Sequence, residues 1–175
     1  MTVPEFSRPL GVDTLSEEPR RLGVEAEEAE RLHLARRFGV IAIGSLAADV
    51  ALSRKGDEIA LEGTLTASVS QACVATGEPV EARIESPFAI LFRPHPEAAG
   101  GEEELELGES EMDVVFYDGR AVDVGEAVAE TLLLNLDPYP RAPGAEEALK
   151  AAGVKSEAEA GPFGALAGLR DKLKP

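Results

Sequence analysis

The sequence predicts an α+β fold: a strongly bent antiparallel sheet with one main helix packed against it and a second, N-terminal helix outside. Three patterns lead to this prediction. Polar and apolar residues alternate over most of 47–94, apolar residues recur at helical spacing over 123–136, and a shorter helical pattern precedes the strands. A sheet that bends this strongly can also close in part, so a partial barrel is the variant of the same fold.

The first element is expected between Glu25 and Arg37. This stretch is rich in residues that favour helices, and its apolar residues form a ragged stripe. We therefore predict one N-terminal helix here and assign nothing to the residues before it.

Strands are expected next, because the pattern changes to a period of two. Residues from Ile59 to Val69 place apolar side chains on one parity and Glu, Thr and Ser on the other, which indicates a strand with one wet face. The segment SRKGDE, with Gly56, is a plausible hairpin turn from a preceding strand that carries Val50 and Leu52. The segment TGEP, with Gly77 and Pro79, is most simply a hairpin turn. The alternation resumes from Val80 to Phe92, where Pro87 predicts an edge position or a bulge. A further strand is expected in MDVVFYDG.

The main helix is expected to begin at Asp123 and to stop before Pro138. Asp123 is a suitable N-cap, and Glu126 has the spacing of a carboxylate that answers the cap residue's own N–H. Leu133 and Leu134 widen the apolar arc, which predicts a last turn buried on most sides. Pro138 disfavours helical geometry at Asp137.

The domain organisation predicted from these patterns is one domain over 1–145 followed by a flexible tail over 146–175. An acidic loop is expected near 94–111, where Gly, Pro and Glu dominate. The tail contains a short apolar segment, PFGALAGL, that could dock on another surface.

Composition limits the classes of partner. With 17 Lys and Arg against 33 Asp and Glu, the chain of 175 residues has a formal charge of -16, so direct binding to free RNA is not expected and a basic protein is favoured. The start lacks a secretory pattern, no apolar run approaches a membrane span, and the single Cys73 fits a reducing compartment. The expected location is the cytoplasm, and the oligomeric state stays open.

Two segments together resemble a known family. CVATGEPVEARIESPFAILF and YDGRAVDVGEAVAETLLLNLDPYPR resemble the cysteine turn with its strand, and the acidic helix with its proline turn, of the YceD family of large ribosomal RNA subunit accumulation proteins. PFGALAGL resembles the end of the family's chain, and the arginine-rich N-terminal helix resembles the alphaproteobacterial branch. The resemblance implies a non-enzymatic ribosome-assembly factor needed for 23S rRNA accumulation, whose partner is a basic ribosomal protein or a large-subunit precursor.

The resemblance also bears on metal binding. Many family members carry a second cysteine three residues after the first, where this chain has Thr76. A structural zinc site needs about four nitrogen or sulfur ligands, whereas the chain has one cysteine and two histidines, His33 and His95. We predict no metal and no cofactor.

Two alternatives to the assembly factor remain at this point. Cys73 could be the nucleophile of a thiol-dependent hydrolase with His95 as its base, although neither lies in a recognisable motif. The chain could also be a dedicated carrier for one basic ribosomal protein, which predicts a binary complex without any ribosomal particle.

The predicted contact surface is an acidic ridge on the main helix together with the turn that ends it. Asp123, Glu126 and Glu130 follow each other at spacings of three and four, so they share one side of a helix. The alternative is that Asp123 and Glu126 only cap the helix while Tyr139 packs and Arg141 pairs with a carboxylate. The full set of predicted partner-binding residues is Glu78, Asp118, Asp123, Glu126, Glu130, Asp137, Tyr139 and Arg141.

Overall fold

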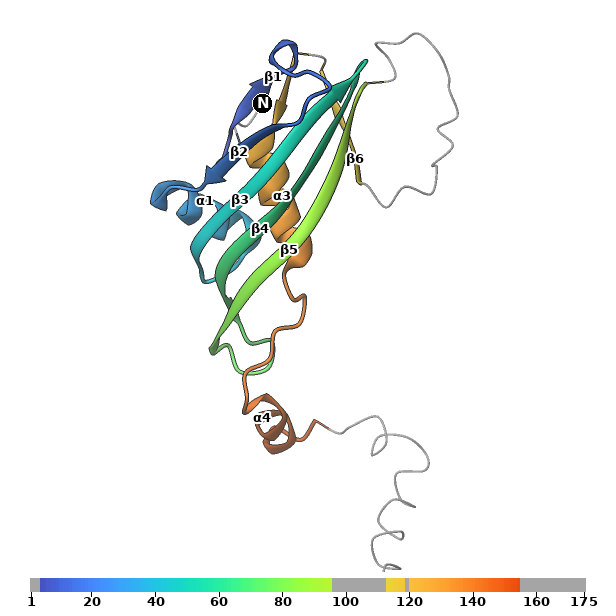
Figure 1. The fold of residues 1–175 in the computed structure, drawn as a ribbon. Coiled ribbons are helices and arrows are strands. Elements are labelled where there is room, and N and C mark those ends of the chain that lie inside the picture. The colour runs from blue at the N-terminus through green and yellow to red at the C-terminus, as the bar shows by residue number, and fades with distance from the viewer. Residues whose placement is uncertain (1–3, 96–112, 119, 155–175) are drawn as a thin grey trace, which may run out of the picture. The chain divides into compact units, whose positions relative to one another are not determined.

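The computed structural model describes residues 4–95, 113–118 and 120–154 (Figure 1). The strands are β1 (Pro9–Gly11), β2 (Arg20–Glu25), β3 (Ala42–Lys55), β4 (Glu58–Ala72), β5 (Pro79–Pro94), β6 (Asp113–Tyr117) and β7 (Ala121–Asp123). The helices are the 3-10 turn η1 (Val12–Thr14), α1 (Glu28–Phe38), α3 (Val124–Asn135) and α4 (Ala145–Ala151). The predicted α+β class is confirmed.

Five strands form one sheet in the order β2-β3-β4-β5-β6, and β1 pairs with β7 in a separate two-stranded sheet. The larger sheet is not closed into a barrel. The pairs β2–β3 and β3–β4 are antiparallel, the second of them as predicted, but β6 runs parallel to β5, so the sheet is mixed. An antiparallel sheet throughout was the wrong expectation, because it assumed hairpin connections. The connection over 95–112 exceeds the dozen residues that a parallel pair needs.

The position of Pro87 follows from the short length of β6. Strand β6 pairs only with Ile90–Pro94 of β5, so Pro87 lies where β5 has no described partner on that side. A proline lacks the N–H of a ladder hydrogen bond and is tolerated at such an edge. The predicted edge position of this residue is confirmed.

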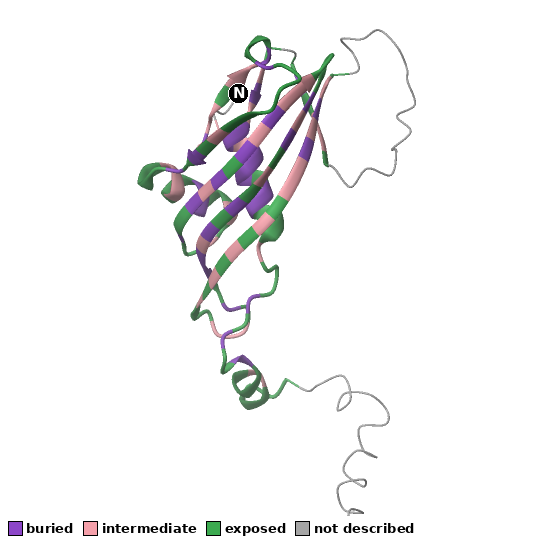
Figure 2. Cartoon of the chain, in the orientation of Figure 1, coloured by how far each residue is buried: buried purple, intermediate pink, exposed green. Residues whose placement is uncertain are grey.

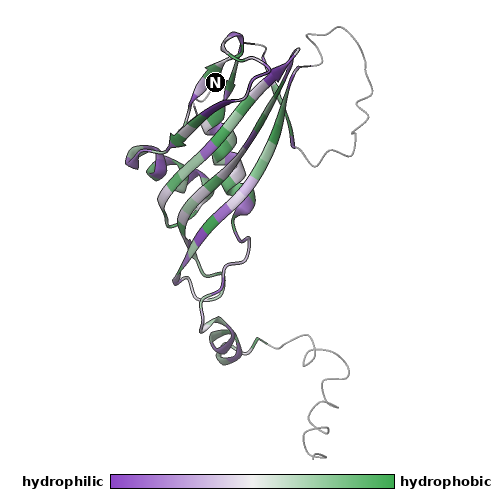
Figure 3. Ribbon diagram, in the orientation of Figure 1, coloured by the Kyte–Doolittle hydropathy of each residue, from purple (hydrophilic) through white to green (hydrophobic). Residues whose placement is uncertain are grey.

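The core lies between the sheet and α3, which crosses behind β3, β4 and β5 (Figure 1). The inward residues of β3 and β4, such as Leu52, Leu61 and Leu65, are fully buried in one cluster with Val128 and Leu132 of α3. Figure 3 shows the strands banded by hydropathy, as the period of two predicts. This alternation leaves the other face of the sheet polar.

The N-terminal residues contribute more than the predicted helix. Helix α1 forms where expected and ends at Gly39, whose φ of 67° is the left-handed conformation that glycine adopts readily. Strands β1 and β2 were not predicted. Strand β2 has only Leu22 and Val24 as apolar side chains facing inward, because it is the edge of the sheet, where exposed charged residues discourage pairing with other chains.

Helix α3 begins and ends where the sequence predicts, but its last turn differs from the prediction. Asp123 is the N-cap, and the helix stops at Asn135. Leu133 is 44% exposed and Leu134 is 77% exposed, so the expected burial of the last turn on most sides was wrong. Figure 2 shows the same change from buried to exposed along the helix. The helix contacts the sheet through a single stripe of side chains. Leu133 and Leu134 follow Leu132 directly in the sequence, so they point away from that stripe.

The described residues divide into two compact units. One contains residues up to Gln71 together with Glu81–Pro138, and the other contains Ala72–Val80 together with the chain from Tyr139 onward. The predicted acidic loop and the segment PFGALAGL lie outside the described residues, and the predicted boundary at residue 145 stays a prediction. Helix α4 occupies the first part of the predicted tail. None of the described helices combines the length and apolar character needed to cross a membrane.

Candidate functional site

Asp123 is the first residue of the predicted ridge. Its side chain is used in hydrogen bonds within the fold. Its carboxylate accepts hydrogen bonds from the hydroxyl of Ser7, from the backbone N–H of Arg8 at 2.7 Å and from the N–H of Glu126 at 3.1 Å. The N–H of Val124 in turn donates to the carbonyl of Arg8 at 3.1 Å. The predicted cap is confirmed, and the same carboxylate also fastens the N-terminal segment to α3.

Glu126 is paired inside the molecule as well. Both of its oxygens accept from the guanidinium of Arg37 on α1, at 2.6 and 3.0 Å, and Arg37 also donates to Glu5 at 3.0 Å. The side chains of Arg37 and Glu126 are 33% and 21% exposed, so this pair is partly shielded from water. The sequence predicted that the Glu126 carboxylate would accept a hydrogen bond from the backbone N–H of Asp123. In the structure it pairs with Arg37 instead. The hydrogen bonds to Glu126, and then those to Glu5, hold the pKa of Arg37 above its ordinary range.

Glu130 has a different environment from the other two carboxylates. It is exposed, and the described part of the chain provides it with no hydrogen bond or ion pair. Partial burial, and then the negative charge of Glu126, raise the pKa of the Glu130 carboxyl above its usual value. Of the three acids in the predicted ridge, Glu130 is therefore the one that is open to a partner.

A groove of about 270 Å³ brings Glu130 together with other residues of the predicted surface. It lies between α3 and β6, and we call it the α3–β6 groove. Its apolar lining includes Phe92, Val115, Val122 and Ala127, and its acidic lining is Asp118, Asp123, Glu126 and Glu130. Four of the eight predicted residues thus share one groove.

Asp118 stands at the end of β6, on the opposite side of the groove from α3. It is exposed, and one of its oxygens accepts from the N–H of Arg120 at 3.1 Å. Next to it, Tyr117 is buried in the core and its hydroxyl donates to the carbonyl of Asp57 at 2.7 Å. The buried tyrosine anchors the strand end, and the adjacent carboxylate remains accessible to solvent.

The proline turn after α3 begins with Asp137, which is exposed. Its carbonyl accepts from the side-chain amide of Gln71 at 2.9 Å, and Gln71 is buried at the end of β4. This hydrogen bond fixes the point at which the chain leaves the helix. A role of Asp137 in binding stays a prediction.

The remaining predicted residues, Glu78, Tyr139 and Arg141, belong to the second unit. There the turn after β4 packs on the proline segment, since the N–H of Val74 donates to the carbonyl of Pro140 at 2.9 Å. Glu78 is exposed and accepts from the Thr76 hydroxyl at 3.2 Å within its own turn. Tyr139 is 72% exposed, and the alternative in which it packs while Arg141 pairs with a carboxylate stays a prediction. Arg141 is also exposed.

Cys73 holds this second unit together. Its sulfur accepts from the N–H of Ala142 at 3.3 Å, and it forms a small buried cluster with Ala142 and Ala145. Gly77 has a φ of 75°, and its N–H donates to the carbonyl of Cys73, which closes the predicted turn. The N–H of Ala142, and then the Thr76 hydroxyl, lower the pKa of the Cys73 thiol to about 7.

None of the contacts that the described residues make with Cys73 involves a histidine. The sulfur is buried and serves as a hydrogen-bond acceptor for backbone groups. The ring of His95 instead packs against Phe116, with 5.4 Å between ring centroids. Within the described residues, no three His, Cys, Asp or Glu side chains converge on a position that could hold a metal ion.

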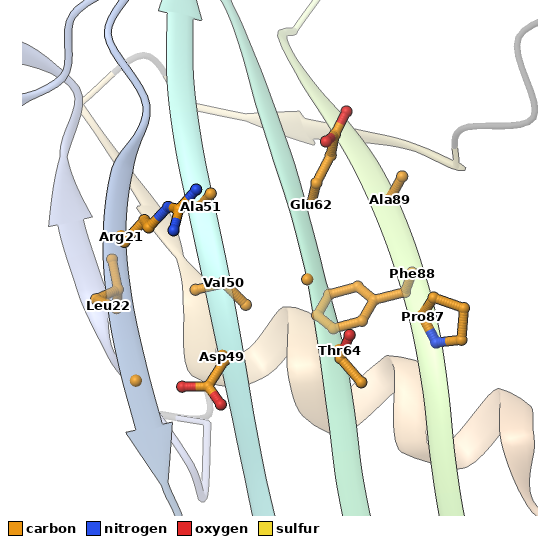
Figure 4. A pocket seen from close by; sticks show the side chains of 12 residues that line it. Arg21, Leu22, Asp49, Val50, Ala51, Glu62, Thr64, Pro87, Phe88 and Ala89 are labelled. Carbon is orange, nitrogen blue, oxygen red and sulfur yellow. The ribbon is translucent and has the colours of Figure 1, made fainter.

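A larger hollow of about 1080 Å³ lies on the face of the sheet that points away from α3 (Figure 4). Arg21 on β2, Asp49 on β3 and Glu62 on β4 border it, and small side chains such as Ala51 and Thr64 lie between them. The alternation in β4 predicted a wet face here. It could not predict the hollow, because that depends on unpredicted β2 and on the cross-strand register.

No sequence pattern indicated which residues form hydrogen bonds with Asp123 and Glu126. Ser7, Arg8 and Arg37 lie in segments where no contact with α3 was expected, and Arg37 is 89 residues away from Glu126. The only signal was the abundance of arginine near the N-terminal helix. Charge composition alone does not say which carboxylate each arginine meets.

Comparison with known proteins gives one match. A family model described as "Large ribosomal RNA subunit accumulation protein YceD" matches residues 61–170. Neither a curated protein nor a solved structure showed a significant match. The matched range contains α3, β6, every lining residue of the α3–β6 groove and all the predicted binding residues.

Proposed function

The chain belongs to the YceD family, and from that premise we propose that it is a non-enzymatic assembly factor of the large ribosomal subunit, needed for accumulation of its 23S rRNA. The family match is the observation that carries the proposal. It covers residues 61–170, which include most of β4, all of β5 and β6, helix α3 and the turn around Cys73.

The proposed mode of action is binding to a basic ribosomal protein or to a precursor particle that displays one. The formal charge of -16 repels phosphate and attracts basic surfaces, and this favours a protein over free rRNA as the first contact. The open carboxylates Asp118 and Glu130 provide a local site for such an attraction. We propose the cytoplasm as the compartment, where assembly of the subunit takes place.

Fractionation of a cell extract tests this function. The full chain, carrying an affinity tag, should co-migrate with a large-subunit precursor in a density gradient, and cells without it should accumulate less 23S rRNA. Migration only as free protein, with normal rRNA levels in the deletion strain, would contradict the proposal.

The same experiment separates the carrier hypothesis from the assembly factor. A carrier predicts a stable binary complex with one basic protein in an extract depleted of ribosomal particles, whereas an assembly factor is retained by the particle. In parallel, a salt titration with purified rRNA should show no tight, sequence-independent binding, because the chain lacks the net positive charge that such binding uses.

A further inference from the structure

We propose that the α3–β6 groove receives an arginine side chain from an extended, basic segment of the partner protein. The proposal rests on the proposed function to the extent that the partner is a basic protein. It goes further in assigning the contact to one groove, one type of side chain and one principal carboxylate, Glu130.

The charges around the groove favour a cation. Its lining includes four carboxylates and no lysine or arginine. Arg37 compensates Glu126, and three hydrogen-bond donors occupy Asp123, so neither acid is available without breaking an internal contact. Glu130 on α3 and Asp118 at the end of β6 remain open on two sides of the groove. A cation between them would meet two carboxylates for which the described residues provide no ion pair.

The apolar part of the groove favours a long amphipathic side chain over a small cation. Phe116, which is 39% exposed, and the half-buried Val115 line the groove, and they can cover the aliphatic stem of an arginine or lysine while its charged end reaches the acids. A hydrated metal ion gains no stabilisation from contact with apolar side chains. The combination of an apolar lining and open carboxylates therefore fits a side chain with both characters.

Arginine suits this position better than lysine. The guanidinium is more weakly hydrated than an ammonium group, so it loses less hydration energy on entering a partly enclosed site, and it packs well against aromatic rings such as that of the exposed Phe116. It also presents several N–H donors in one plane, which allows it to reach carboxylates on two walls. An ammonium group offers a compact charge without this spread of donors.

The hollow on the opposite face of the sheet gives a useful contrast (Figure 4). It is larger, but a cation, Arg21, borders it as well as the acids Asp49 and Glu62. Its mixed charges select no single class of partner. The charged side chains that line the α3–β6 groove are all carboxylates, and this favours a positively charged ligand.

A titration of the isotope-labelled full chain with a short peptide of alternating arginine and glycine tests the inference. We expect saturable NMR shifts at Val115, Ala121 and Ala127. Glu130→Gln should weaken binding about tenfold, the effect of losing one charge-assisted hydrogen bond. The matched control is Glu81→Gln, which removes the same charge from an exposed position of β5 and should change the affinity less than about twofold. The same peptide with lysine in place of arginine should bind more weakly.

Three results would overturn the inference: shifts that cluster away from the groove, equal losses for Glu130→Gln and Glu81→Gln, or equal affinity for the two peptides. Equal losses would mean that only the overall negative charge attracts the peptide. If the groove fails these tests while the chain still co-migrates with a precursor particle, only the groove assignment falls. If the chain never associates with a particle, the proposed function falls whatever the peptide does.

Discussion

The two halves of helix α3 differ in how many internal contacts their side chains make. At its start, Asp123 and Glu126 accept hydrogen bonds from Ser7, Arg8 and Arg37, and the backbone of the N-terminal segment lies directly against the helix. In its second half, the exposed Glu130 has no described hydrogen bond or ion pair, and Leu134 is 77% exposed, although Leu132 between them is fully buried. The first half joins three parts of the fold, whereas the second half also carries side chains that are presented to solvent (Figure 2).

This difference shows that carboxylates on one helix face are not equivalent. Asp123, Glu126 and Glu130 have the spacing of a continuous ridge, yet internal donors occupy two of the three. A charge that already has a good internal partner contributes little attraction for an external one, and removing it damages the fold. Substitutions in α3 should therefore cause large losses of stability at the packed positions and small ones at the exposed positions.

The largest effect is expected from truncating a leucine of the packed stripe. Leu132 is 0% exposed, so Leu132→Ala should lower the free energy of unfolding by about 2 to 5 kcal/mol, through lost apolar burial and the cavity left behind. Leu134→Ala makes the same chemical change two residues later at an exposed position and should stay within about 0.5 kcal/mol of the wild type. Urea denaturation of both variants measures the difference. Similar losses would show that the last turn is packed after all.

A smaller but specific effect is expected at Gly125, in the first turn of α3. Alanine normally stabilises a helix relative to glycine by about 1 kcal/mol. Here a Cβ would lie 2.3 Å from the carbonyl oxygen of Phe6 and 3.0 Å from the nitrogen of Arg8, both of them backbone atoms that cannot rotate away. Gly125→Ala should therefore destabilise the protein by about 1 to 3 kcal/mol.

Hydrogen exchange provides the test for Gly125→Ala. Faster exchange should appear first in β1 and at the N–H of Val124, because the N-terminal segment must move away from α3. A variant as stable as the wild type or more so would show that this segment is not fixed against the helix.

Sequence patterns predicted the parts of the fold that depend on local periodicity. The start and stop of α3, the long strands and the turn at Gly77 were all predicted, since caps, alternation and a glycine of positive φ act over a few residues. Strand β2 was missed because an edge strand needs few apolar residues. The parallel pairing of β6 was missed because strand direction depends on where a long connection returns the chain.

The candidate site could be predicted only in part, because it also depends on contacts between residues far apart in the sequence. Its acidic residues were found from spacing, but the choice of Glu130 over Glu126 depends on Arg37, which lies 89 residues from Glu126 in the sequence. Contacts over such a separation leave no periodic pattern. The groove itself also requires β6 to lie beside α3, which only the three-dimensional structure shows.

The smallest and most discriminating effects are expected from neutralising Glu126 and Glu130 separately. Glu126→Gln breaks the pair with Arg37 and should lower stability at neutral pH by about 1 kcal/mol, between the values typical of exposed and of buried pairs. Glu130→Gln should instead raise the stability at neutral pH. Partial burial raises the pKa of Glu130 in the folded state, so its ionisation disfavours folding.

The pH dependence tests this sign. The contribution of Glu130 to stability is fully present below the pKa of the unfolded carboxyl, where both states are protonated, and is lost as the pH rises through the raised pKa of the folded state. Glu130→Gln should therefore match the wild type in acid and exceed it slightly at neutral pH, by less than about 0.5 kcal/mol because the carboxylate is exposed. Thermal or urea unfolding across this pH range measures the difference. A loss of stability at neutral pH would mean that Glu130 has an internal partner, and the two halves of α3 would then be alike.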